Sequence, residues 1–147
     1  MSLITVQDAL VAIIQTSEHF NQENCTRDDP TPLGAGHDHV CIVRYAGDRV
    51  ELAGDNNEWG FTWTINCDLW FRQVGQFARY NDQVSLLVQA IYSTVLAYPT
   101  LDTGPAIWQV RPVGQGEPDK YTGELQNWWT VSLPFEIHER QVIALLE

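Results

Sequence analysis

The chain has 147 residues, of which 44% are hydrophobic and 11% aromatic, with six tryptophans. This is the usual length of one domain, and the apolar content is enough to bury a core without disulfides or metals, so we expect a single domain over residues 1–147. Eight basic residues against 19 acidic ones give a net charge of −11, which disfavours phosphate binding over most of the surface and excludes a general nucleic-acid-binding protein.

The three cysteines are Cys25, Cys41 and Cys67, an odd number at wide spacing with no CxxC pair. This usage is typical of reduced thiols in a cytoplasmic protein. No apolar run approaches the roughly 20 residues that a bilayer-spanning helix needs, so we expect no membrane segment.

An amphipathic helix is predicted to open the chain. Thr5 is a suitable N-cap, and an apolar stripe follows it with helical spacing. The stripe consists of Val6, Ala9, Leu10, Ile13 and Ile14. Residues 16–36 are polar and rich in turn formers, which predicts a long loop of the kind that orders against a neighbouring protein.

Two short strands, 40–45 and 49–52, are predicted on either side of a turn at Ala46-Gly47-Asp48, forming a hairpin. The segment 59–71 has the clearest pattern in the chain, with an apolar residue at every odd position. These residues are Trp59, Phe61, Trp63, Ile65, Cys67, Leu69 and Phe71. The alternation predicts a long strand with one face against helices and the other face polar.

A second helix is predicted from a cap at Asp82 to Tyr98, ending at Pro99. Residues 106–111 and 129–137 read as two further strands, separated by a polar arm at 112–124. The state of the tail from Glu139 is left open. The element order predicts an α+β fold, a two-layer sandwich with a mostly antiparallel sheet and two main helices on one face.

One cluster of side chains suits a metal ion. His37, His39 and Cys41 would share one side of a strand, as the ligands of a zinc-dependent hydrolase would. A zinc site needs a fourth ligand, however, and the candidates are distant, so a polar loop leading into a strand is the preferred interpretation. Because no phosphate-binding or nucleophile motif is present either, we expect no cofactor, no metal and no catalytic residues.

Two tryptophans occupy the face of the sheet that should meet water. Trp70 and Trp128 fall on the even, otherwise polar sides of their strands. An exposed tryptophan is often the buried anchor of a complex. The alternative, that other parts of the same chain cover these side chains, has equal weight.

Taken together, these elements resemble the tail terminator and tail completion proteins of long-tailed bacteriophages. The resemblance rests on the order of the elements over nearly the whole chain, from the Thr5 helix and the loop up to Gly36, through the 59–71 strand and the helix running to Tyr98, to the closing segment 128–137. No short motif carries it.

The resemblance implies a structural virion protein, assembled in the host cytoplasm and located in the tail or neck. It implies a homo-oligomeric ring, a hexamer in this family, which contacts the tail tube protein and the head-tail connector while DNA passes through it. The corresponding surfaces here are the polar strand faces and the two loops. The interface candidates are Trp70, Trp128, Thr64, Asn66, Asp68, Asp28, Asp29, Glu117, Asp119, Lys120 and Tyr121. A non-viral module that binds a ligand or protein is the main alternative.

Overall fold

The computed structural model describes residues 3–27, 39–52, 58–72, 77–99, 101, 107–114, 119–120 and 128–142. Its elements, in chain order, are α1 (Leu3–Ile14), β1 (Cys25–Arg27), β2 (His39–Leu52), β3 (Glu58–Arg72), α2 (Phe77–Leu96), β4 (Ile107–Pro112), β5 (Asp119–Lys120) and β6 (Trp128–Val142).

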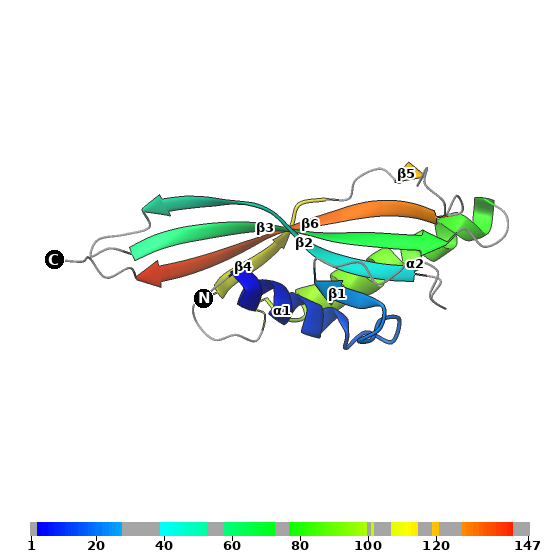
Figure 1. Ribbon diagram of the computed structural model, residues 1–147, viewed down its shortest axis with the longest axis horizontal. Helices are drawn as coiled ribbons and strands as arrows, with labels where there is room; N and C mark the ends of the chain where they lie inside the picture. Colours follow the sequence, from blue (N-terminus) through cyan, green and yellow to red (C-terminus); the bar gives the residue numbers. More distant parts are fainter. Residues whose placement is uncertain are drawn as a thin grey trace.

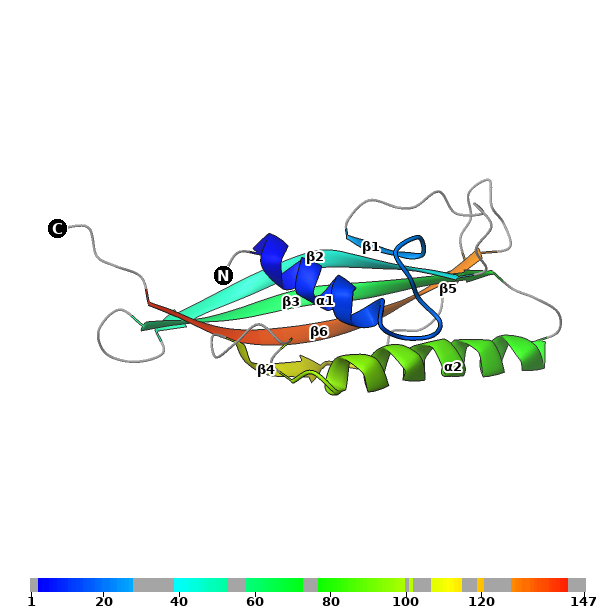
Figure 2. The same cartoon turned by 90° about the horizontal axis from the view of Figure 1, so that it is seen from below.

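One sheet, in the order β1-β2-β3-β6-β4, forms the first layer, and β5 pairs with β6 beside β4. Every described pair of strands is antiparallel except β1 with β2. Both helices lie on the same face of this sheet (Figures 1 and 2). The predicted α+β sandwich of two layers is therefore confirmed.

The core lies between the helices and the odd-numbered face of the central strands. On β3, Ile65 to Phe71 bury their odd side chains completely, and β6 does the same from Val131 to Ile137. The stripe of α1 and the inner side of α2 close the layer from the other side. Their buried residues are Val6, Leu10, Ile13, Ile14, Val84, Leu87, Val88, Ile91 and Val95. Burial of these apolar side chains is the main source of stability.

The predicted hairpin at residues 46–48 is wrong. Residues 39–52 form one continuous strand that pairs with β3 along its length, with a bulge between Tyr45 and Gly47. Gly47 has φ +132°, a conformation that L side chains rarely adopt. The turn-like composition thus marks an extra residue in a strand, because β3 is long enough to pair with both halves.

Both helices begin earlier than predicted. Thr5 and Asp82 lie inside α1 and α2 and are not their caps. The predicted loop 16–36 contains the short strand β1, and the last strand continues beyond Ile137 to Val142. In the described part of the chain, neither helix is both long enough and apolar enough to cross a membrane.

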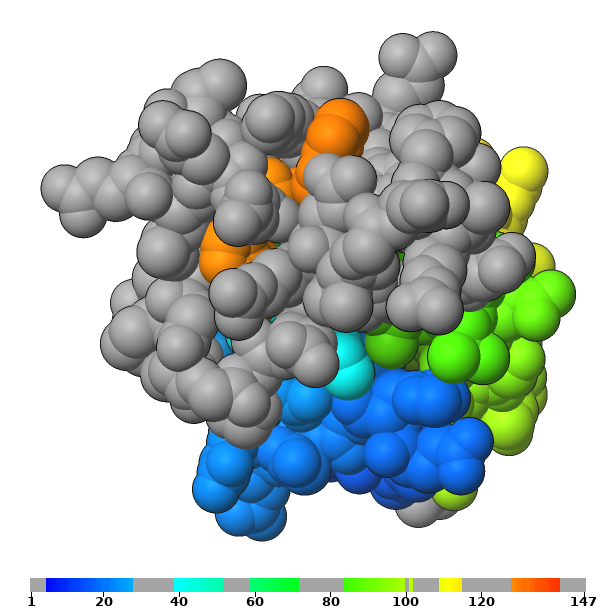
Figure 3. All heavy atoms as spheres, turned by 90° about the vertical axis from the view of Figure 1, so that its right-hand side faces the viewer, coloured from blue at the N-terminus to red at the C-terminus, as the bar shows by residue number. Residues whose placement is uncertain are grey.

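The sheet continues past the helices. The ends of β2, β3 and β6, residues 46–52, 58–64 and 136–142, form an arm that extends to the left in Figure 1, away from α2, and β4 pairs with its β6 strand as far as Glu139. The other end of the molecule is the helix-covered end. Figure 3 looks at it directly and shows the segment leading up to Arg27 (blue) beside α2 (green).

Candidate functional site

Polar side chains of the arm and the adjoining strands form a surface, here called the open face, on the side of the sheet away from the helices. On β3 and β6 these are the even-numbered residues, whereas on β2 after the bulge and on β4 they are odd-numbered. The residues of the open face are Arg44, Arg49, Glu51, Thr62, Thr64, Asn66, Asp68, Gln109, Arg111, Glu136, His138 and Arg140. All of these side chains are at least partly exposed. A sheet face that remains polar and accessible is the surface that this fold offers to solvent or to a partner.

Interactions between neighbouring strands organise the open face. Asp68 accepts a hydrogen bond from the Ser132 hydroxyl at 3.0 Å and forms an ion pair with Nε of Arg44 at 3.4 Å. Farther along, the hydroxyl of Thr62 lies 3.2 Å from Nδ1 of His138. Cross-strand pairs of this kind fix the side chains at modest energy, about 0.2–1 kcal/mol each. The surface is thus pre-arranged before anything binds to it.

The predicted interface residues Thr64, Asn66 and Asp68 lie together on this face, on consecutive even positions of β3. Trp70 follows them and is half-buried. The structure therefore places four of the predicted residues along one strand. Their role in an interface remains a prediction.

The structure corrects the expectation for Trp128. It is only 3% exposed, so the expectation of a surface tryptophan is wrong, and the alternative that the chain covers it holds. Val40 and Ile42, on the same face of β2, are also buried. At the helix-covered end both sides of the sheet are therefore apolar, and only the arm and the middle of the sheet keep an accessible polar face.

The loop candidates cannot be placed in the same way. Asp28, Asp29, Glu117 and Tyr121 lie outside the described residues. Asp119 and Lys120 form β5, where they pair with Thr130 and Trp129.

The opposite side of the arm, which continues the face that meets the helices, is aromatic. The alternation in residues 59–71 predicts these apolar positions but not that they lie beyond the helices. The rings of Phe61 and Trp63 stack with centroids 5.6 Å apart, and Tyr45 meets Trp63 edge-on at 6.4 Å. Tyr45 is 43% exposed and Val50 45% exposed, because the helices end before this part of the sheet. Glu139 lies on the same side and is fully buried.

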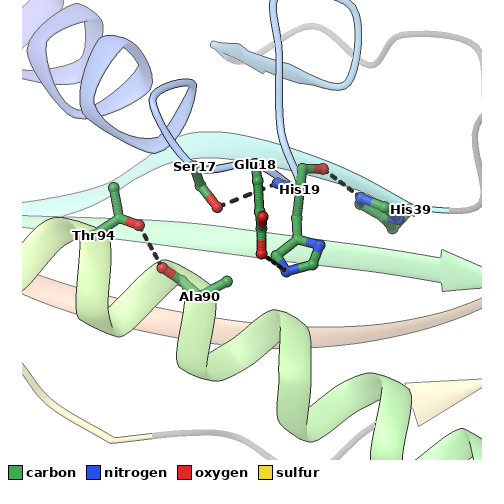
Figure 4. A network of polar contacts seen from close by, with 6 residues as sticks. All are labelled: Ser17, Glu18, His19, His39, Ala90 and Thr94. Atoms are coloured by element: carbon green, nitrogen blue, oxygen red, sulfur yellow. Dashed lines mark hydrogen bonds and ion pairs between the residues drawn. The ribbon is translucent and has the colours of Figure 1, made fainter.

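The residues of the alternative zinc site do not lie together in the described part of the chain. The His39 ring donates from Nε2 to the backbone carbonyl of His19, and it packs edge-on against Phe20. Figure 4 shows this contact beside the pair between Glu18 and the His19 ring, 3.4 Å apart. Cys41 is buried, and His37 lies outside the described residues. Within the described ranges, no three His, Cys, Asp or Glu side chains form a group able to hold a metal ion.

The three cysteines, distant in sequence, are neighbours in the sheet. Cys25 of β1 pairs with Cys41 of β2, and Cys67 of β3 is one position farther along the same face. A hydrogen bond with Cys41 and burial raise the pKa of Cys25 far above its ordinary value. The hydrogen bond with Cys25 lowers the pKa of Cys41, but the bond with Cys67 and burial outweigh it and raise that pKa. Cys25 and Cys41 are thus kept protonated, which makes these two thiols poor nucleophiles and metal ligands.

The sequence and the structure give different results when they are compared with known proteins. No family model matches the sequence, and no curated protein matches it. Among solved structures, a chain from the virion of a native gene transfer agent particle is similar at a TM-score of 0.48 and 13% identity, over 90% of this chain and 84% of that one.

Proposed function

We propose that this chain is a structural virion protein, a tail terminator or completion subunit that forms a ring at the head-proximal end of a phage tail tube and joins it to the neck. The observation that carries the proposal is the arm: three paired strands continue beyond the helices and leave a polar face on one side and aromatic side chains on the other. The sequence resemblance to tail terminator proteins supports the same role.

The arm is unusual for a protein that acts alone. A sheet normally covers its apolar face, yet here Phe61 and Trp63 are only half-buried and Val50 is 45% exposed. Apolar and aromatic side chains that remain accessible in a single chain mark a contact surface when they gather in one place. Both sides of the arm are thus available to neighbouring subunits.

The edge of β2 supports assembly as well. Among the described strands, β1 pairs only with residues 41–43 of β2, so residues 44–52 have β3 on one side and no described strand on the other. An edge strand carries backbone groups that pair readily with another chain. Arg49 and Glu51 on this edge carry opposite charges. Charged side chains on an edge strand hinder pairing with unrelated strands but still allow pairing with a strand of complementary charge.

In this role the protein catalyses no reaction and binds no cofactor. Its partners are copies of itself, six in the ring, together with the tail tube protein and the head-tail connector, and DNA passes through the ring without being recognised. Its place is the tail or neck of the virion, after assembly in the host cytoplasm. The second predicted loop, 112–124, is the proposed contact with the tube or the connector.

Sedimentation velocity across a wide range of protein concentrations, with negative-stain imaging of the largest species, tests this proposal. We expect a closed ring of defined mass that appears as concentration rises. A protein that stays monomeric at every concentration, and that does not cap purified tail tubes either, would refute it. The control is Leu86→Ser, which changes an exposed apolar residue of α2, away from the arm, and should leave the ring intact.

A further inference from the structure

The open face carries an uneven share of the positive charge. Four of the eight basic residues lie there, on strands β2, β4 and β6: Arg44, Arg49, Arg111 and Arg140. Among the side chains that the structure describes on this face, these four arginines stand against three carboxylates, Glu51, Asp68 and Glu136, while the whole chain has 8 basic and 19 acidic residues. The open face is therefore the part of the sheet to which an acidic surface is attracted.

Two of these arginines, Arg49 and Arg140, lie on either side of a row of small residues on β3. Gly60, Thr62 and Thr64 of the central strand β3 face the same way as Arg49 on one neighbouring strand and Arg140 on the other. The Arg49 side chain is 62% exposed, and Arg140 is exposed as well. Long charged side chains on both sides of short ones suit a protein segment that lies across the strands.

The same chain carries an acidic surface at its helix-covered end. The turn after α1 exposes Glu18, whose side chain is 87% exposed, and Glu23. This turn belongs to the segment that is blue in Figure 3, at the end of the molecule opposite the arm. Since the two surfaces lie at opposite ends, one chain cannot bring them together.

We propose that the open face of one copy docks onto the acidic turn, Glu18 to Glu23, of a second copy. The inference rests on the proposed ring and names the surfaces that build it. A contact between two different surfaces of identical chains is head-to-tail, and such contacts repeat until the rotation closes a ring. Charge complementarity would set the register and the rate of association.

Phosphate is the other ligand that arginines attract, and the face is poorly built for it. Asp68 holds Arg44 at 3.4 Å, and Glu51 holds Arg49 at 3.2 Å. Carboxylates beside the arginines repel the closely spaced charges of a phosphate backbone, whereas the turn brings only two carboxylates, Glu18 and Glu23, which Arg49 and Arg140 can meet. A second copy is thus favoured over DNA.

A charge-exchange experiment tests the contact by sedimentation velocity. The variant Arg49→Glu/Arg140→Glu damages only the open face, and Glu18→Lys/Glu23→Lys damages only the acidic turn. Each alone should associate more than about tenfold more weakly than the native chain, because like charges then meet. Mixed in equal amounts they should associate again, since each supplies the surface that complements the other.

Two controls separate charge placement from net charge. Arg49→Gln/Arg140→Gln and Ser85→Glu/Gln89→Glu both change the net charge by −2, but the second pair lies on the exposed side of α2. Only the first should weaken association, and raising salt from about 0.05 to about 0.5 M should reproduce its effect.

Three results would overturn the inference. Rings that form equally well in all variants would place the contact elsewhere and leave the proposed function intact, whereas a native chain that never associates would remove both. Fluorescence anisotropy with a duplex oligonucleotide supplies the third: binding that the native chain shows and Arg49→Gln/Arg140→Gln loses would make the open face a phosphate site.

Discussion

Trp63 donates a hydrogen bond from its indole Nε1 to Oε2 of Glu139, 3.3 Å away, across the paired strands β3 and β6. Glu139 is fully buried and occupies the position where the apolar face of β6 would otherwise continue after Ile137. A buried carboxylate is costly unless hydrogen bonds compensate it. The bond therefore links two strands of the arm, β3 and β6, close to the core.

Replacing Trp63 by Phe should lower the free energy of unfolding by about 1–3 kcal/mol, because Glu139 loses a donor while remaining buried. Glu139→Gln keeps an acceptor for the indole and removes the charge, so it should cost less. Urea denaturation measures both variants, and a Glu139→Leu background, which offers the indole no acceptor, supplies the double variant that measures the coupling. Equal losses for Trp63→Phe in the native and the Glu139→Leu backgrounds would show that the bond contributes nothing.

Trp128→Ala should destabilise the fold by about 3–5 kcal/mol, as expected for a large aromatic side chain removed from a packed site. Thermal unfolding provides the measurement. Trp70→Ala is the matched comparison, since Trp70 is on the same face but half-buried, and its loss should be smaller. A Trp128→Ala variant as stable as the native chain would contradict the burial of this residue.

The alternation of residues 59–71 was sufficient to predict β3 and the face that meets the helices. It could not show where the helices end above the strand, so Phe61 and Trp63 look like core positions although they are only half-buried. The extent of a helix over a sheet is a tertiary property, and local periodicity does not contain it.

The sequence contains one indication that Trp128 is buried. The run Val40-Cys41-Ile42-Val43 is apolar at every position, which is typical of a strand buried on both faces. It indicates that the even side of the sheet is covered at that end, where Trp128 also lies. Glu139 had no such signal, because a carboxylate after an apolar strand usually marks its exit to solvent.

The bulge at Gly47 yields a third prediction. Gly47→Ala should cost about 1–3 kcal/mol, because alanine is strained at φ +132°. No other atom lies within 4 Å of the added methyl group, so the cost is conformational and not steric. Ala46→Ser, at the exposed neighbouring residue, is the control and should leave the urea midpoint almost unchanged. A tolerated alanine at position 47 would mean that the strand relaxes without the bulge.

The raised pKa values of Cys25 and Cys41 make stability depend on alkaline pH. In the unfolded chain these thiols ionise near their ordinary pKa of 9.0, whereas in the fold they stay protonated. Above that pH the unfolded state binds fewer protons than the folded state, so the free energy of unfolding falls as pH rises. Each buried thiol should contribute a loss of about 1.4 kcal/mol per pH unit in that range.

Thermal unfolding between pH 7 and 10 measures this effect. The melting temperature should be level up to about pH 8 and fall above it, and Cys41→Ala should reduce the slope, whatever its effect on stability at pH 7. Alkylation by iodoacetamide at pH 8 should be slow in the native chain and fast in urea, because a protonated, buried thiol is a poor nucleophile. Rapid alkylation of the folded chain, or a slope that Cys41→Ala leaves unchanged, would show that these thiols are not held protonated by the sheet.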